Sequence, residues 1–159
     1  MSLTTLGHAL LAGLVNGAFY AFLAVGFAAI LGLTRALNLA HGELVVLGGY
    51  LGYAAAGSLG WPPLAVAPLA ALAMVPIGLL WRVLLARVRE PIELNSMVLT
   101  FGLSLLLQNV MLGAWSADYR LFASEAGVAP PVVLGLSRER AVAGGVGLAA
   151  IAALHVLLT

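Results

Sequence analysis

"GHALLAGLVNGAFYAFLAVGFAAILGL" occupies residues 7–33 and contains no Asp, Glu, Lys or Arg. About 20 mainly apolar residues in a helix are enough to cross the hydrocarbon core of a bilayer, so this stretch predicts a membrane-spanning helix. The rest of the chain has the same character: 63% of the 159 residues are hydrophobic, 8% are charged, and the mean hydropathy is +1.11. Soluble domains contain about 25% charged residues. The composition therefore indicates an integral membrane protein that lies in a lipid bilayer.

Several classes of protein are disfavoured by the same composition. The formal net charge is only +1, which leaves no basic footprint for nucleic acid. The sequence has no Cys, so disulfides, thiolate chemistry and Cys-based metal sites are excluded. The first charged side chain is Arg35, so the N-terminus lacks the basic region of a signal peptide. We expect the first apolar stretch to be retained as a span.

Four further apolar stretches follow the first. The sequence SLGWPPL at 58–64 divides a long uncharged region, because Trp61 suits a membrane interface and the Pro62-Pro63 pair suits a turn followed by a helix start. A polar loop covers 116–140. The fold class that we predict is an all-α, polytopic transmembrane helix bundle of about five spans, forming a single membrane domain over 1–159, with the later spans at 39–58, 63–83, 94–117 and 141–159.

The orientation of the spans follows from the short loops that contain Arg. Cytoplasmic loops are enriched in Lys and Arg. With the N-terminus outside, Arg35 and the Arg cluster at 82–89 both face the cytoplasm, whereas Trp61 and the loop at 116–140 face outward. The opposite orientation would export the densest Arg cluster. We therefore predict that the N-terminus is outside.

A small polar segment precedes the second predicted span and consists of Asn38, His41, Gly42 and Glu43. Residues two apart on a helix point to different faces, so His41 and Glu43 would not hold a metal together. Gly42 tolerates unusual backbone angles. One interpretation is an interfacial hairpin, in which Asn38 caps the second helix and Glu43 lies in its positive first turn. The other is a helix terminus or break that lines a polar pathway or its gate.

Other polar residues lie inside the spans. Interhelical hydrogen bonds are the simpler explanation for such residues, and a translocation path that they line is the alternative. One pair lies a turn apart in the first span, and three residues follow each other at a spacing of four in the fourth span, with one more beside them. These candidates are Asn16 and Tyr20, then Thr100, Ser104 and Gln108, and finally Asn109.

Catalytic and metal-binding motifs are missing from the sequence. It has no nucleophile elbow, no phosphate loop, no pair of intramembrane carboxylates and no pair of His residues four apart. We expect no catalytic residue, no metal site and no cofactor. Two GxxxG steps, at Gly13–Gly17 and Gly48–Gly52, indicate close helix packing within the bundle, with a dimer interface as the alternative.

Three blocks resemble the membrane permease subunits of branched-chain amino-acid ABC importers. They are NGAFYAFLAVGFAAILGL at 16–33, NLAHGELVVLGGY at 38–50 and LTFGLSLLLQN at 99–109, and their order and spacing also agree with the family. The block around Asn38, His41, Gly42 and Glu43 is far more specific than a GxxxG step. By resemblance, these four residues match a signature block of the family, and the likeness covers most of residues 16–109.

The resemblance implies a multi-pass subunit of the bacterial inner (cell) membrane that forms the solute pathway with a second permease subunit. Cytoplasmic ATPase subunits would hydrolyse ATP, so this chain would be a transport subunit and not an enzyme. A periplasmic solute-binding protein would deliver a branched-chain or similar amino acid. A function of another class, a small structural or assembly membrane protein without transport activity, uses the same polar residues to hold helices together.

The sequence departs from the family pattern in two places. The family commonly has Arg-Pro-x-Arg after the third span, whereas this chain has Glu90-Pro91-Ile92-Glu93. The sequence also stops at Thr159, about half of the usual extent of the family, which resembles the N-terminal half of a permease. From this we expect that the chain alone neither transports solute nor recruits an ATPase.

Overall fold

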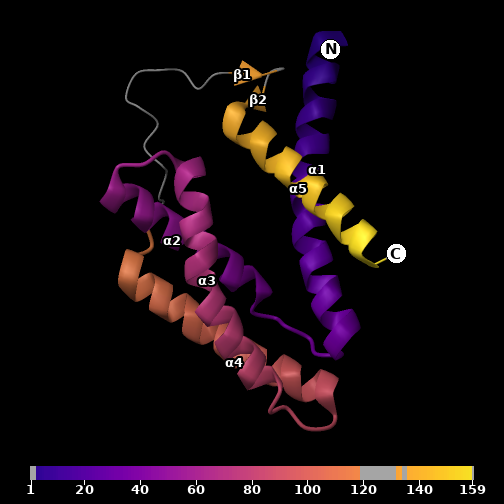
Figure 1. Ribbon diagram of the computed structural model, residues 1–159, viewed down its shortest axis with the longest axis vertical. Coiled ribbons are helices and arrows are strands. Elements are labelled where there is room, and N and C mark those ends of the chain that lie inside the picture. The colour runs from indigo at the N-terminus through magenta and orange to yellow at the C-terminus, as the bar shows by residue number, and fades with distance from the viewer. Residues whose placement is uncertain (1–2, 119–131, 134–135, 159) are drawn as a thin grey trace. The chain divides into compact units, whose positions relative to one another are not determined.

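The computed structural model describes residues 3–118, 132–133 and 136–158, and it is almost entirely helical (Figure 1). Two short antiparallel strands pair Val132 with Ser137 and Val133 with Leu136. The predicted all-α membrane fold is confirmed. The elements in chain order are α1 (Leu3–Thr34), α2 (His41–Leu59), α3 (Pro63–Leu85), α4 (Ile92–Trp115), β1 (Val132–Val133), β2 (Leu136–Ser137) and α5 (Arg138–Leu158).

The helix ends follow local backbone chemistry. Gly60 has a φ of 67° and terminates α2, and its N–H donates to the carbonyl of Ala56 at 2.9 Å. Glycine adopts this left-handed conformation without steric cost. α3 then begins with Pro63, where a missing N–H removes no helical hydrogen bond. The turn predicted from SLGWPPL is therefore present and separates the second helix from the third.

The number of membrane crossings is a separate question from the number of helices. Within the described residues, three helical segments are long and apolar enough to cross a bilayer: Thr5–Thr34, Pro63–Leu85 and Ile92–Trp115. α2 is not among them, and its 19 residues include His41 and Glu43. The apolar part of α5, Gly144–Ala153, is shorter. Five crossings remain a prediction.

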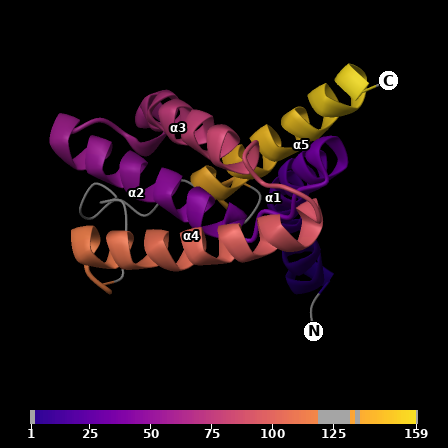
Figure 2. The same ribbon diagram turned by 90° about the horizontal axis from the view of Figure 1, so that it is seen from below.

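The chain divides into two compact units. One contains residues 1–29 and 124–159, and the other contains residues 30–123. The second unit holds α2, α3 and α4; α2 lies against both other helices, beside α3 on one side and α4 on the other (Figure 2). Its buried apolar side chains come from all three helices and include Leu47, Val66, Trp81 and Met111. A single membrane domain over residues 1–159 stays a prediction.

Large apolar side chains cover the outside of this second unit. Leu72 is 67% exposed, Val98 is 66% exposed and Leu80 is 57% exposed. Soluble proteins rarely expose so much contiguous apolar surface. In a membrane protein these side chains face lipid tails, which are as apolar as Leu itself. The exposed apolar surface of this unit therefore agrees with the hydrophobic composition of the chain, which indicates a membrane protein.

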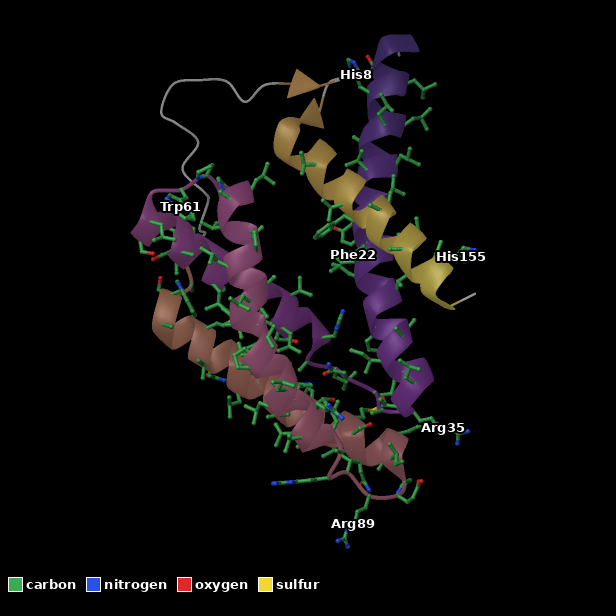
Figure 3. The ribbon with its side chains drawn as sticks, viewed as in Figure 1. His8, Phe22, Arg35, Trp61, Arg89 and His155 are labelled. Carbon is green, nitrogen blue, oxygen red and sulfur yellow. The ribbon has the colours of Figure 1, made fainter. Side chains whose placement is uncertain are left out.

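In the first unit, two glycines allow α5 to lie close against α1. A Cβ at Gly144 would lie 2.8 Å from Cγ1 of Val15, and a Cβ at Gly147 would lie 3.0 Å from the carbonyl oxygen of Ala18 and 3.5 Å from Cβ of Phe22. Figure 3 shows Phe22 on α1 beside the point where α5 crosses it. Small residues permit this close approach between helices in lipid.

The predicted GxxxG step at Gly13–Gly17 does not make this contact. A Cβ at either glycine would have no described neighbour within 4 Å. Gly48 does face the side chain of Met74, whose Cγ lies 3.8 Å from the Cβ position, so the second step takes part in α2–α3 packing. Close packing within the bundle is thus found for one of the two steps.

Replacement of Gly144 by Val should weaken the α1–α5 contact. The added side chain meets Val15, and overpacking of this kind costs about 1–3 kcal/mol. Gly145→Val is the matched control, because Gly145 is exposed and its Cβ position has nothing within 4 Å. The same change of residue in the same helix cancels differences in helix propensity. SDS titration of the purified variants, followed by circular dichroism, measures the difference. Equal stability of the two variants would contradict the contact.

Candidate functional site

The segment between α1 and α2, residues 35–40, is not helical, and its backbone is hydrogen-bonded to α4. The N–H of Leu37 donates to Oγ of Ser96 at 2.9 Å, and the N–H of Leu39 donates to Oγ1 of Thr100 at 3.0 Å. The carbonyl oxygen of Leu37 lies 3.0 Å from the same Thr100 hydroxyl. Two side chains of α4 thus supply hydrogen bonds that a regular helix would supply to its own backbone. We call residues 35–40 the connecting segment.

The spacing of polar residues along α4 explains why these hydroxyls face the connecting segment. Ser96, Thr100, Ser104 and Gln108 are four residues apart, which places them on one face of the helix. The first three are buried. The last three were predicted from the sequence and Ser96 was not, although Ser96 continues the same spacing one turn earlier. Asn109 does not belong to this face, and its side-chain amide donates to the carbonyl of Leu105 at 2.7 Å.

Asn38 ties the connecting segment to α3. Its side chain is 2% exposed, and its Oδ1 accepts hydrogen bonds from the N–H of Ala40 at 3.2 Å and from Nε1 of Trp81 at 3.2 Å. The interpretation in which Asn38 caps the second helix is therefore wrong. The residue before the helix is Ala40, which makes no side-chain capping hydrogen bond. Asn38 instead closes a local turn and anchors that turn to Trp81, a residue that was not predicted for the site.

Glu43 lies in the first turn of α2, as predicted, and reaches across to α4. Nε2 of Gln108 donates to Oε1 of Glu43 at 2.7 Å and lies 3.3 Å from Oγ of Ser104. The predicted polar face of α4 therefore contacts the predicted polar segment, which lies partly before and partly within α2. We call Glu43, Ser104 and Gln108 the carboxylate cluster.

The other two residues of the polar segment have different roles from Glu43. His41 is the first residue of α2 and is partly buried. Gly42 is helical and exposed, and a Cβ added to it would have nothing within 4 Å. The unusual backbone angles that Gly42 would tolerate are thus not used. The positive-φ residue nearby is Arg35, with a φ of 54°, where α1 ends.

The contacts between α2 and α4 occur in parallel order along both helices. Glu43 meets Gln108, and seven residues later on each helix the rings of Tyr50 and Trp115 stack with centroids 4.9 Å apart. Before α2 begins, Leu39 meets Thr100. Thr100 and Gln108 are the ninth and seventeenth of the 24 residues of α4. α2 therefore begins beside the middle of α4, not beside its end.

Asn16 and Tyr20 lie on α1 in the other compact unit, and both are exposed within it, Tyr20 by 68%. The structure brings together Asn38, Glu43, Thr100, Ser104 and Gln108 from the predicted set. A role of Asn16 and Tyr20 in a pathway remains a prediction.

The chemical groups of the site suit binding and positioning. They comprise one carboxylate, two amides, three hydroxyls and an indole N–H. In the described part of the chain, no three His, Cys, Asp or Glu side chains gather as a metal site. Every buried side-chain nitrogen or oxygen described has a hydrogen-bond partner.

A family model for the permease component of branched-chain amino acid transport systems matches residues 9–159. The chain belongs to this family. It is a membrane protein and a permease component of amino acid transport. The match includes the polar segment of α2 and the hydroxyl-bearing face of α4. No curated protein and no solved structure matches the chain.

Replacement of Ser96 by Ala should destabilise the second unit. The N–H of Leu37 loses its acceptor, and a partly buried donor without a partner costs about 1–3 kcal/mol. Ser58→Ala is the matched control: Ser58 is exposed and its hydroxyl donates within its own helix to the carbonyl of Ala55. An exposed substitution of this kind changes stability by about 0.5 kcal/mol or less. Trp fluorescence during SDS unfolding reports the second unit, because all three Trp residues lie in it. Equal losses for the two variants would show that Ser96 does not hold the connecting segment.

Proposed function

We propose that this chain is the permease subunit of an ATP-driven importer of branched-chain amino acids in the bacterial inner membrane. It spans the membrane several times and forms the solute pathway with a second permease subunit. Cytoplasmic ATPase subunits supply the energy, and a periplasmic solute-binding protein delivers the amino acid. The observation that carries the proposal is the family match together with the break between α1 and α2.

The proposed partner ATPases rest on the family match, since a permease component is one part of a transport system, and the sequence of this chain agrees with them. A phosphate loop needs a Lys that reaches the phosphates of the nucleotide, and the 159 residues include no Lys. Work against a concentration gradient needs an energy source, so hydrolysis is assigned to other subunits. The apolar helices of this chain supply the membrane part of the assembly.

The helix break gives the proposed pathway its physical basis. The 24 residues of α4 extend about 36 Å, enough to cross a hydrocarbon core of about 30 Å. Since α2 begins beside the middle of α4, the connecting segment and the carboxylate cluster lie at membrane depth when α4 crosses. Transporters use discontinuous helices of this kind at their solute sites. We assign Asn38, His41, Gly42 and Glu43 to this pathway or its gate, with Thr100, Ser104 and Gln108.

Non-helical backbone is tolerated at that depth only when protein or water satisfies it. In this chain Ser96, Thr100 and Asn38 provide hydrogen bonds to the connecting segment. The segment is therefore fixed in place at a point where the chain is not helical. A fixed break can expose polar groups to a passing solute without exposing unpaired backbone to lipid.

The orientation of the second unit is tested at the two ends of α3. Figure 3 shows Arg35 and Arg89 at one end of this unit and Trp61 at the opposite end. Because Arg-containing short loops face the cytoplasm, we propose that the N-terminus is outside. Cysteine at Ser58 should react with an impermeant maleimide added outside intact cells, and cysteine at Arg87 should react only after the membrane is permeabilised. The reverse pattern would overturn the orientation.

The transport function is tested by uptake in proteoliposomes. The chain, co-expressed with its neighbouring permease, ATPases and solute-binding protein, should accumulate radioactive leucine only when ATP is present on the ATPase side. Excess isoleucine or valine should compete, and excess lysine should not. A complex whose ATPases carry an inactivating substitution is the control. Purified, assembled complex that never takes up a branched-chain amino acid would contradict the proposal.

A further inference from the structure

Glu43 supplies the charge at the helix break. In residues 36–81 it is the sole Asp, Glu, Lys or Arg, and residues 94–117 have none. The groups around its carboxylate are neutral: the amide of Gln108 donates to it, and the hydroxyl of Ser104 lies beside that amide. A carboxylate at membrane depth is costly, and acidic residues there usually mark the path of a substrate or an ion. The negative charge is thus present where no Lys or Arg of either segment balances it.

The contact between Gln108 and Ser104, both on α4, fixes the direction of the Glu43 carboxylate. Nε2 of Gln108 is held between Oε1 of Glu43, at 2.7 Å, and Oγ of Ser104, at 3.3 Å. Ser104 is 6% exposed, so its hydroxyl belongs to the packed α2–α4 contact. A carboxylate has about four lone-pair sites, more than the contacts with Gln108, Ser104 and its own backbone N–H occupy. The cluster therefore presents an oriented acceptor with capacity for further donors.

We propose that Glu43 receives the α-ammonium group of the amino acid as it passes the helix break, and that Gln108 is a positioning residue for the carboxylate. This inference rests on the transport function proposed above. An ammonium group has three donors and one positive charge, so it neutralises Glu43 and makes charge-assisted hydrogen bonds with it. The same charge repels the carboxylate of the solute. The zwitterion therefore passes with its ammonium end toward the α2–α4 contact.

The first test separates charge from shape. Glu43→Gln keeps the shape of the side chain and removes the charge, whereas Glu43→Asp keeps the charge and shortens the side chain. Per assembled complex, Glu43→Gln should lower ATP-dependent leucine uptake at saturating solute-binding protein at least ten-fold, and Glu43→Asp should retain more uptake than Glu43→Gln. Glu93→Gln is the matched control, since Glu93 is also in the first turn of a helix and is exposed; its uptake should stay within two-fold of the parent.

The second test restores charge chemically. The chain has no Cys, so Glu43→Cys introduces its single thiol. Reaction with an anionic sulfonatoethyl methanethiosulfonate should raise uptake several-fold above that of the unmodified variant. Reaction with the cationic trimethylammonium-ethyl reagent, which adds a group of similar length, should not raise it. A role confined to helix packing would not distinguish the sign of the added charge. The same reagents applied to the Cys-free parent chain are the control.

Each outcome decides between the two proposals. Parent complex that transports leucine while Glu43→Gln transports equally well overturns the role of Glu43 and leaves the transport function intact. The same holds if Glu43→Asp is no better than Glu43→Gln, or if both reagents restore uptake equally. Parent complex that takes up no amino acid overturns the transport function and this inference with it. If Glu43→Gln fails to assemble, the comparison of the two reagents on assembled Glu43→Cys still decides.

Discussion

The hydrogen bonds between the connecting segment and the hydroxyls of α4 determine how the second unit is arranged. Backbone N–H and C=O groups need partners wherever water is absent, and a segment that leaves the helical conformation loses those within its own chain. Ser96 and Thr100 replace two of them. Because these hydroxyls are fixed on a rigid helix, the backbone bound to them is fixed as well. The position of α2, and with it Glu43, follows from that attachment.

Three consecutive residues of the connecting segment bond to two helices. The backbone of Leu37 and Leu39 faces α4, whereas the side chain of Asn38 bonds to Trp81 on α3. α2, α3 and α4 are thus held together at the point where the chain is least regular. This explains why a strongly polar Asn is buried in a chain of such high hydropathy.

Composition and the positions of uncharged stretches were sufficient to predict the helices, because a bilayer imposes a minimum length and excludes charge. The predicted second helix nevertheless began at 39, whereas α2 begins at His41. Local capping preference favoured Asn38 as the cap, but residues 37–39 are not helical and are hydrogen-bonded to residues far along the sequence. No pattern within 38–47 contains that information. The family blocks, in contrast, led to the correct family without any structural knowledge.

The glycine steps show the same limit. A GxxxG pattern says that a second helix is able to approach, but it does not say which one. Gly13 and Gly17 have no described neighbour at their Cβ positions, while Gly144 and Gly147, which no pattern singled out, make the close contact with α1. The face of α4 was easier to predict, since a spacing of four residues identifies a helical face. The partner of that face was not predictable. It is the backbone of Leu37 and Leu39, and every residue type has the same backbone carbonyl group.

The distance along the chain between hydrogen-bond partners has a consequence for biogenesis. The hydroxyls that bind residues 37 and 39 belong to residues 59 and 61 positions later. When α1 and α2 leave the ribosome, those hydroxyls have not yet been synthesised. The backbone N–H groups of the connecting segment then have no α4 hydroxyl to which they can donate in place of water. The hydrogen bonds of this segment with α4 therefore form only after α4 has been made. The order of translation and the order in which these backbone groups are buried differ.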